Sequence, residues 1–386
     1  MEIYLDNAAT SHPKPECVTQ AVQEALTTFN ANPGRAGHAR ARAAGRIVLS
    51  ARETLSGILD ADDPFCIVHT SNCTDALNLA IKGVLQKGDH VISTMLEHNS
   101  VLRVLMEKKQ RDEIDVTLVK PRGWCIDPAD IRASIRKNTR LIIITHASNV
   151  TGAIQPAGEI CSIAFEKGIF CLVDGAQYLG SAPVSVRKLK CSLYAFPGHK
   201  SLLGPAGTGG LYIAPGISLS TLREGGTGSA SDSMLQPPEA PERYEAGTVN
   251  LPGIAGLNAG AQYILNHLSR IHTQENTLSD MLYRGIKHIP GIILYSPAEA
   301  SARAGIVTLN LNDMTSSELA DSLDRAGILV RGGLHCAPGA HETLGTLQRG
   351  AVRLSIGHAT TPEEIEYTIR TLYYISRGWE VPAFNS

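Results

Sequence analysis

The stretch LIIITHASNVTGAIQPAGEICSIAFEKGIFCLVDGAQ, residues 141–177, decides the fold class. It begins with the apolar run 141–145, passes through a segment of helical pattern at 157–168, and ends with a second apolar run at 170–173. Short apolar runs without alternation are typical of strands buried on both faces, and a helix between two of them indicates a parallel pair. The stretch therefore predicts an α/β protein built on a mostly parallel sheet.

The same alternation continues on both sides of this stretch, from about residue 44 to residue 215. Helices are expected at 44–60 and 74–85, and further strands at 65–69, 90–94, 116–119, 192–196 and 209–213. In such sheets ligands bind at the carboxyl ends of the strands. Polar residues that directly follow the strands are therefore the candidate site.

The C-terminal part of the sequence has a different pattern. Residues 215–250 are rich in Gly, Ser and Pro and are expected to form a long functional loop. A long helix is expected at about 253–288, and the remainder resembles an α+β unit with strands at 305–311, 328–332 and 351–357. The chain of 386 residues is long enough for two domains, since domains usually have roughly 100–200 residues.

Composition excludes several classes of function. The formal net charge is -2, so neither a nucleic acid nor a membrane surface is indicated as a partner. No signal peptide is expected, and no apolar run approaches the roughly 20 residues of a membrane span. The eight cysteines are scattered without a CxxC pair or zinc-like spacing, which favours a cytoplasmic protein with reduced thiols and no metal site.

Two strand ends carry the most informative residues. Asp174 ends an apolar strand, with Gln177 three residues later, and a carboxylate aimed into a crevice needs a cationic partner. The protonated pyridine nitrogen of pyridoxal phosphate (PLP) is such a partner, whereas a helix N-cap is the alternative. Lys200 follows the strand 192–196 in a tight turn with His199, where partial burial suits a Schiff-base lysine; a solvated loop lysine is the alternative.

Three more strand ends carry polar groups. Cys73 and Thr74 stand where a helix begins, which predicts a phosphate site or an ordinary N-cap. His98 and Asn149 each follow a strand, and each alone is as consistent with a structural role. Together the five strand ends place polar groups at one edge of the sheet, which favours a cofactor site.

These pieces resemble the class V aminotransferase-fold PLP enzymes, in particular the cysteine desulfurase and selenocysteine lyase family. The matching segments span nearly the whole chain: YLDNAATS (4–11), SNCTDALN (71–78), EHNS (97–100), SNVTGAIQP (148–156), VDGAQ (173–177), GHKSLLGPAGTGGLY (198–212), YEAGTVN (244–250) and VRGGLHCAP (330–338). The resemblance implies an aspartate aminotransferase-like fold with a mostly parallel seven-stranded sheet. It further implies a large PLP-binding domain at 16–260 and a smaller α+β domain made of 1–15 and 261–386.

The resemblance also implies a role for each matching residue. Lys200 would form the Schiff base, His98 would stack on the ring and move protons, and Asp174 would pair with the ring nitrogen. Gln177 and Asn149 would approach the ring hydroxyl. The phosphate would be held by the helix start at Cys73 and Thr74, by His199, and by Thr248 from the partner subunit of a homodimer. Asn7 and Arg353 would bind the substrate carboxylate, with Arg331 close by.

Cys336 matches the sulfur-accepting cysteine of the family. It lies in the loop RGGLHCAPGAH, which resembles the group with a short, ordered catalytic loop, and His335 and Arg331 are expected to favour its thiolate. Two residues depart from the family pattern. Pro197 replaces a hydroxyl residue, so one phosphate contact is expected to be missing, and Leu334 replaces a second His of some relatives.

The leading hypothesis is therefore a cysteine desulfurase that converts L-cysteine to L-alanine and passes the sulfur to Cys336 as a persulfide, with a possible sulfur-acceptor protein. Selenocysteine lyase, another C–S lyase and an aminotransferase are the alternatives on the same scaffold, since one fold hosts many chemistries. An aminotransferase has no use for Cys336. A non-enzymatic module would be expected to have lost Lys200 or Asp174, and both are present.

Overall fold

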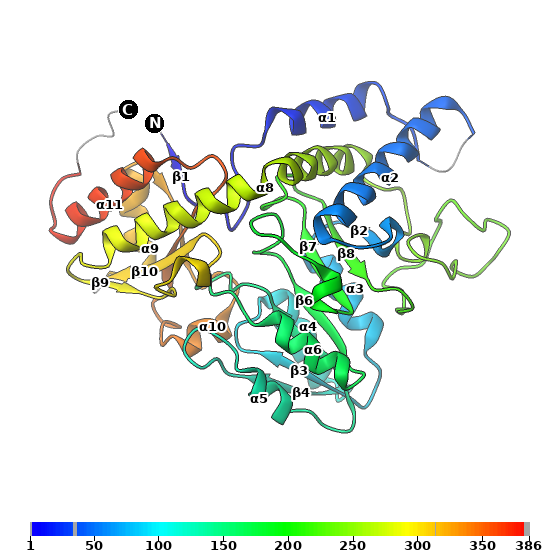
Figure 1. Ribbon diagram of the computed structural model, residues 1–386, viewed down its shortest axis with the longest axis horizontal. Coiled ribbons are helices and arrows are strands. Elements are labelled where there is room, and N and C mark those ends of the chain that lie inside the picture. The colour runs from blue at the N-terminus through cyan, green and yellow to red at the C-terminus, as the bar shows by residue number, and fades with distance from the viewer. Residues whose placement is uncertain (1, 34–36, 313, 382–386) are drawn as a thin grey trace.

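The computed structural model describes residues 2–33, 37–312 and 314–381, and a seven-stranded sheet lies at its centre (Figure 1). The strand order is β2-β8-β7-β6-β5-β3-β4. The strands are β2 (Ile67–Thr70), β3 (Asp89–Thr94), β4 (Ile114–Val119), β5 (Thr139–Thr145), β6 (Phe170–Asp174), β7 (Leu193–Pro197) and β8 (Gly209–Ile213). Only β8 pairs antiparallel with its neighbours, so the predicted mostly parallel seven-stranded sheet is confirmed.

Helices cover both faces of this sheet because its strands are apolar on both sides. Within β5, Ile142 and Ile144 join the apolar cluster that holds α2 (Ala39–Leu59) and α6 (Ala157–Glu166). Leu141 and Ile143 join the opposite cluster, with α3 (Cys73–Val84) and α4 (Asn99–Gln110). Successive side chains of a strand point to opposite faces, so one short strand supplies both cores. Two shorter helices, α5 (Pro128–Ala133) and α7 (Val186–Leu189), complete this part.

A second apolar core lies toward the C-terminus. Its four-stranded antiparallel sheet has the order β12-β13-β10-β9, with β9 at Ile292–Leu294, β10 at Ile306–Leu311, β12 at Arg331–Gly333 and β13 at Ala351–Ser355. A separate parallel pair joins β1 (Ile3–Tyr4) to β11 (Ile328–Leu329). The helices of this part are α9 (Ser316–Arg325), α10 (Pro338–Thr343) and α11 (Pro362–Ser376). The N-terminal strand thus belongs to the C-terminal core.

The long helix α8 (Leu251–Ile286) connects the two cores (Figure 1). Leu257 and Ala261 pack in the core beside the central sheet, whereas Leu278 and Leu282 pack in the second core. Helix α1 (Glu16–Thr27) also contacts α8. The predicted boundary between residues 260 and 261 therefore falls inside a continuous helix, and the division into two domains stays a prediction.

Two segments, 328–333 and 215–250, differ in detail from the secondary structure expected for them. The strand expected after residue 327 is split, because β11 pairs with β1 whereas β12 pairs with β13. The loop 215–250 contains one 3₁₀ turn, Glu242–Tyr244; two others are at Pro64–Cys66 and Ala300–Ala302. None of the helices described here has the length and apolar character needed to cross a membrane.

Candidate active site

The carboxyl ends of the central strands surround one cavity of about 220 Å³. Most of the predicted site residues line it: Cys73, Thr74, His98, Asn149, Asp174, Gln177, His199, Lys200, Arg331 and Arg353. The first eight belong to segments at or after the ends of β2, β3, β5, β6 and β7, and the two arginines come from β12 and β13 of the second core. Ligand binding at this edge is the general rule for such sheets.

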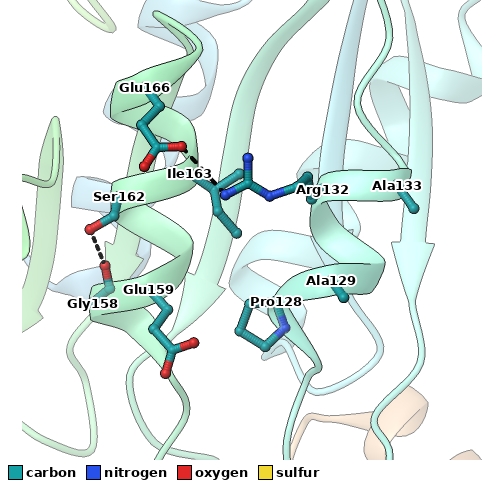
Figure 2. A pocket seen from close by; sticks show the side chains of 9 residues that line it. All are labelled: Pro128, Ala129, Arg132, Ala133, Gly158, Glu159, Ser162, Ile163 and Glu166. Carbon is teal, nitrogen blue, oxygen red and sulfur yellow. Dashed lines mark hydrogen bonds and ion pairs between the residues drawn. The ribbon is translucent and has the colours of Figure 1, made fainter.

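A larger hollow of about 650 Å³ lies at the surface between α5 and α6 (Figure 2). Among its polar side chains, Arg132 lies 3.4 Å from Glu166, and Ser162 donates a hydrogen bond to the Gly158 carbonyl. None of the predicted site residues lines it. Convergent polar groups, rather than size, therefore identify the cavity at the strand ends as the candidate active site.

Asp174 is the last residue of β6, at the carboxyl edge of the central sheet, and it is 3% exposed. Its Oδ1 accepts hydrogen bonds from the Ala176 N–H at 2.9 Å and from the Cys73 thiol at 3.6 Å. Burial raises the pKa of this carboxyl, and the Ala176 N–H, the charge of Lys200 and the Cys73 thiol oppose the shift only in part. A cation against Asp174 would remove that cost. The protonated ring nitrogen of PLP is such a cation, so the site fits this cofactor.

Lys200 follows β7 in a turn that is fixed to the N-terminal segment. The Lys200 carbonyl accepts a hydrogen bond from Ser11 Oγ at 2.8 Å, and the His199 carbonyl accepts one from Lys14 Nζ at 2.7 Å. Burial, with the charge of Arg353 as the second cause, lowers the pKa of Lys200 to about 8. A lysine with a lowered pKa holds more of the neutral amine, which is the form that reacts with an aldehyde.

His98 is the N-cap of α4. Its Nδ1 accepts a hydrogen bond from the Ser100 N–H at 3.1 Å, so the proton of the neutral ring lies on Nε2. Burial, followed by the charge of Lys200, lowers the pKa of His98 to about 4. The ring is therefore uncharged near neutral pH, as stacking on a flat cofactor requires.

The start of α3 forms the side of the cavity expected to hold a phosphate. Cys73 is the first residue of this helix, and Thr74 Oγ1 lies 2.7 Å from Ser100 Oγ. The free N–H groups of a helix start attract anions. Pro197 also lines the cavity, without an N–H or a hydroxyl. The missing phosphate contact predicted for this position stays a prediction.

The two amides predicted to approach the ring hydroxyl are held by backbone groups. Asn149 Nδ2 donates to the His335 carbonyl at 2.6 Å, and Gln177 Nε2 donates to the Ala8 carbonyl at 3.0 Å. Their nitrogens therefore fix the loop before Cys336 and the N-terminal segment. Their contact with a cofactor stays a prediction.

Arg353 has the geometry of an anion-binding residue. It is 2% exposed, and its two terminal nitrogens donate to the Asn149 carbonyl and to Asp6 Oδ1, each at 2.9 Å. Its Nε is buried and has no partner among the described residues. A buried guanidinium N–H without an acceptor costs free energy, and a substrate carboxylate would supply the acceptor.

Three predicted residues are not among those that line the cavity: Asn7, Thr248 and Cys336. Asn7 lines a neighbouring cavity of about 20 Å³, and its amide bonds the backbone of Tyr4, His12 and Ser355. Thr248 is exposed and lines another cavity of about 180 Å³. A single chain therefore does not bring Asn7 or Thr248 to the cofactor site, and their predicted roles are not tested.

Cys336 is exposed at the edge of the cavity in the sense that it directly follows His335, which lines the cavity, without lining it itself. Its Sγ lies 4.0 Å from Arg331 Nη2, and its carbonyl accepts a hydrogen bond from the Asn99 N–H at 2.7 Å. Cys336 and His335 both have left-handed backbones, with φ of 56° and 50°, a conformation that costs about 1–2 kcal/mol for each non-glycine residue. Leu334 is 38% exposed beside them.

The structure corrects the expectation that His335 favours the thiolate. Burial, followed by the charge of Arg353, lowers the pKa of His335 to about 3, so the ring carries no positive charge near neutral pH. Its Nε2 lies 3.1 Å from the Arg331 carbonyl, and its Nδ1 lies 3.2 Å from His341 Nε2. Both ring nitrogens are thus engaged away from the sulfur, and Arg331 is the cation beside Cys336.

Two buried residues near the cavity were not identified from the sequence. Glu97 stands directly before His98 and is fully buried, and His341 stands behind the Cys336 loop, also fully buried. The available signal was a charged residue, Glu97, three positions after the end of an apolar strand. The partner of His341 depends on how the loop folds, and no spacing rule predicts it.

Comparison with known proteins agrees with this geometry. The sequence pattern of the family "Aminotransferase class-V" matches residues 3–368. A "Probable cysteine desulfurase" of Methanothermobacter thermautotrophicus is 36% identical over 97% of this chain and 94% of its own length. A "Cysteine desulfurase" of Pectobacterium carotovorum subsp. carotovorum is 32% identical over 97% of this chain and 93% of its own length.

A solved structure gives the same result. The apo structure of a cysteine desulfurase from Thermococcus onnurineus superposes with a TM-score of 0.92 at 31% identity, and it covers 98% of this chain and 95% of that one. The similarity therefore extends through both cores and includes the segments that carry the cavity. The chain belongs to the class-V aminotransferase family and, within it, to the group that holds the cysteine desulfurases.

Proposed function

We propose that this protein is a PLP-dependent cysteine desulfurase, which converts L-cysteine to L-alanine and takes the sulfur onto Cys336 as a persulfide. The observation that carries the proposal is the position of Cys336. An exposed thiol stands at the edge of a cavity that gathers Lys200 and Asp174, with Arg331 Nη2 4.0 Å from its sulfur. The cysteine desulfurases among the relatives support it.

Bound PLP would supply an electron-poor ring that stabilises negative charge on the substrate. Asp174 would hold the ring nitrogen, Lys200 would bind the aldehyde carbon, and His98 would lie against the ring. The phosphate would lie at the start of α3, where Thr74 and His199 line the cavity. The burial of Asp174, which makes no ion pair with any residue that the structure describes, and the lowered pKa of Lys200 support this arrangement.

The substrate would be oriented by its carboxylate. Arg353 offers a buried N–H without an acceptor, and its guanidinium is fixed by Asp6 and the Asn149 carbonyl. A fixed guanidinium binds a carboxylate with little loss of side-chain entropy. Lys200, which lines the same cavity, would then accept the Cα proton as a neutral amine.

The sulfur transfer would take place between two thiol sulfurs. The Cys336 thiolate forms a bond to the substrate sulfur, and the bond between that sulfur and Cβ breaks. The electron pair of the broken bond stays on Cβ, which takes up a proton and becomes the methyl group of alanine. The persulfide remains on Cys336, where its exposure allows a sulfur-acceptor protein to reach it.

The first test measures alanine and protein-bound persulfide after addition of L-cysteine, for the wild type and for Cys336→Ala. We expect the variant to keep the absorbance of bound PLP and to lose persulfide and at least 100-fold of its alanine formation, because the acceptor of the sulfur is absent. Cys17→Ala is the matched control, since Cys17 is also exposed but lies on α1.

Undiminished alanine formation by Cys336→Ala would contradict the proposal. L-Selenocysteine is assayed in parallel, because a selenocysteine lyase would form alanine from that substrate and little from cysteine. If the wild type binds PLP but forms alanine from neither substrate, PLP remains the proposed cofactor. Substrates of other C–S lyases or of aminotransferases would then be tested.

We further propose a cytoplasmic homodimer with shared active sites. Thr248 is exposed and lies outside the cavity of its own chain, as a phosphate ligand for a partner subunit would. Light scattering is expected to give twice the chain mass of 41.2 kDa. Thr248→Val is expected to weaken PLP binding, and a monomer with full PLP affinity would contradict the shared site.

A further inference from the structure

A chain of hydrogen bonds runs behind the loop that carries Cys336. It joins Thr346 Oγ1 to His341 Nδ1 at 2.8 Å, His341 Nε2 to His335 Nδ1 at 3.2 Å, and His335 Nε2 to the Arg331 carbonyl at 3.1 Å. Thr346, His341 and His335 are 2%, 0% and 3% exposed. Water therefore has little access to these bonds, and a missing partner would leave a buried polar group unsatisfied.

These hydrogen bonds are consistent with only one assignment of donors and acceptors. The Arg331 carbonyl can only accept, so His335 carries its proton on Nε2 and accepts at Nδ1. His341 must then donate from Nε2, which leaves its Nδ1 as the acceptor for the Thr346 hydroxyl. Burial is the largest cause that lowers the pKa of His335 to about 3 and of His341 to about 4, so both rings are neutral.

The hydrogen bond between His335 Nε2 and the Arg331 carbonyl constrains the backbone that carries the Cys336 thiol. His335 directly precedes Cys336, and both residues hold left-handed backbone conformations. Side chains with a Cβ rarely adopt this conformation without outside support. Fixing the His335 ring fixes the turn from Arg331 to Cys336, since the ring and the Arg331 carbonyl close it.

Other contacts hold the same turn from the opposite side. Asn149 donates to the His335 carbonyl at 2.6 Å, and the Asn99 N–H donates to the Cys336 carbonyl at 2.7 Å. These two contacts come from the segments that follow β5 and β3. The turn is thus held both by these two contacts and by the hydrogen bonds of His335 and His341.

We infer that Thr346 and His341 are positioning residues for Cys336: they form a latch with His335 that holds the thiol at the cavity edge beside Arg331. The inference deepens the proposed desulfurase function and rests on it for the role of the sulfur. Neither residue touches the cavity, so the latch acts only through the conformation of the loop.

The test compares Thr346→Val with Thr346→Ser in the full chain loaded with PLP. Valine has the shape of threonine but no hydroxyl, so His341 loses the partner that fixes its tautomer; serine keeps the hydroxyl. Hydrogen exchange followed by mass spectrometry reports the Asn99 and Ala337 amides, which donate to the Cys336 and Leu334 carbonyls. A single turnover with L-cysteine reports persulfide on Cys336.

In Thr346→Val we expect exchange of these two amides to rise about tenfold and persulfide formation to fall about tenfold, which corresponds to about 1.4 kcal/mol, the size of one hydrogen bond. The PLP absorbance is expected to be unchanged, and Thr346→Ser is expected to match the wild type in all three measurements. His341→Phe and His341→Gln form a second pair, in which glutamine keeps a donor toward His335.

Three results would overturn the inference. Valine and serine variants with the same exchange rates would show that no latch exists. Faster exchange with unchanged persulfide formation would show that the latch does not position the thiol. Equal loss in the serine and valine variants, or in both His341 variants, would assign the effect to packing. If the wild type formed no persulfide, the desulfurase proposal would fail, and the exchange rates would still decide whether the latch exists.

Discussion

At the scale of single residues, the cavity changes the proton affinity of Lys200 and His98 in the direction that their proposed roles need. Burial lowers the pKa of Lys200 to about 8 and of His98 to about 4, and it raises the pKa of the Asp174 carboxyl. All three groups are thus shifted toward the neutral form by loss of water. For Asp174 the shift marks a charge that lacks its partner, which is the reason a cationic ring fits beside it.

The pKa of Lys200 predicts how the PLP-free protein captures PLP. With a pKa of about 8, roughly one amine in ten is neutral at pH 7, against about one in three thousand at the ordinary pKa of 10.5. We expect the capture rate, followed by absorbance, to rise about tenfold per pH unit below pH 8 and to level off above it. A rate that still climbs between pH 9 and 10 would contradict the lowered pKa. Lys200→Arg keeps the charge and serves as the control without capture.

At the scale of secondary structure elements, Glu97 connects the carboxyl ends of two parallel strands. Its Oε1 accepts hydrogen bonds from Thr94 Oγ1, at the end of β3, at 2.8 Å and from the Thr145 N–H, at the end of β5, at 3.0 Å. Its Oε2 is buried and has no partner among the described residues. Burial, as the largest cause, raises the pKa of Glu97 to about 8, so the side chain is a neutral carboxylic acid at pH 7.

A neutral acid can be replaced by its amide, and this gives a prediction for the link between β3 and β5. We expect Glu97→Gln to stay within about 1 kcal/mol of the wild type in urea unfolding at pH 7, because its carbonyl can accept both hydrogen bonds. Glu97→Ala is expected to lose about 2–4 kcal/mol, since it opens a cavity and leaves the Thr145 N–H unsatisfied. Equal losses in the two variants would show that the carboxylate charge, rather than the shape, holds the strand ends.

Among the secondary structure elements, the strands could be predicted from the sequence, but some of their pairings and side-chain contacts could not. Apolar runs such as 141–145 and 170–173 predicted β5 and β6, because a strand buried on both faces has no polar alternation. The strand-end rule then placed Asp174 and Lys200 at one edge. The split between β11 and β12, and the bonds of His341, depend on which side chains meet after folding, and a local pattern contains no information on such contacts.

At the scale of the whole molecule, α8 connects the two cores, and Glu275 lies on it between the residues that enter each core. This carboxyl is 7% exposed, and burial, opposed by a hydrogen bond from Ser181, raises its pKa to about 8. It lines the small cavity that Asn7 and Gln177 also line, next to the active site. The helix that connects the two cores thus carries a carboxyl group that is mostly protonated at pH 7.

Glu275 predicts a pH dependence of stability, with a sign that follows from its raised pKa. The unfolded chain releases this proton near pH 4.5 and the folded chain near pH 8, so the folded state binds one proton more between these values. The contribution of Glu275 to stability is therefore complete below pH 4.5 and is lost as the pH rises, at about 1.4 kcal/mol per pH unit, up to pH 8. Glu275→Gln cannot titrate, so its stability relative to the wild type is expected to increase with this slope in urea unfolding from pH 5 to pH 8. Parallel curves for the two proteins would mean that the folded carboxyl titrates as it does in water.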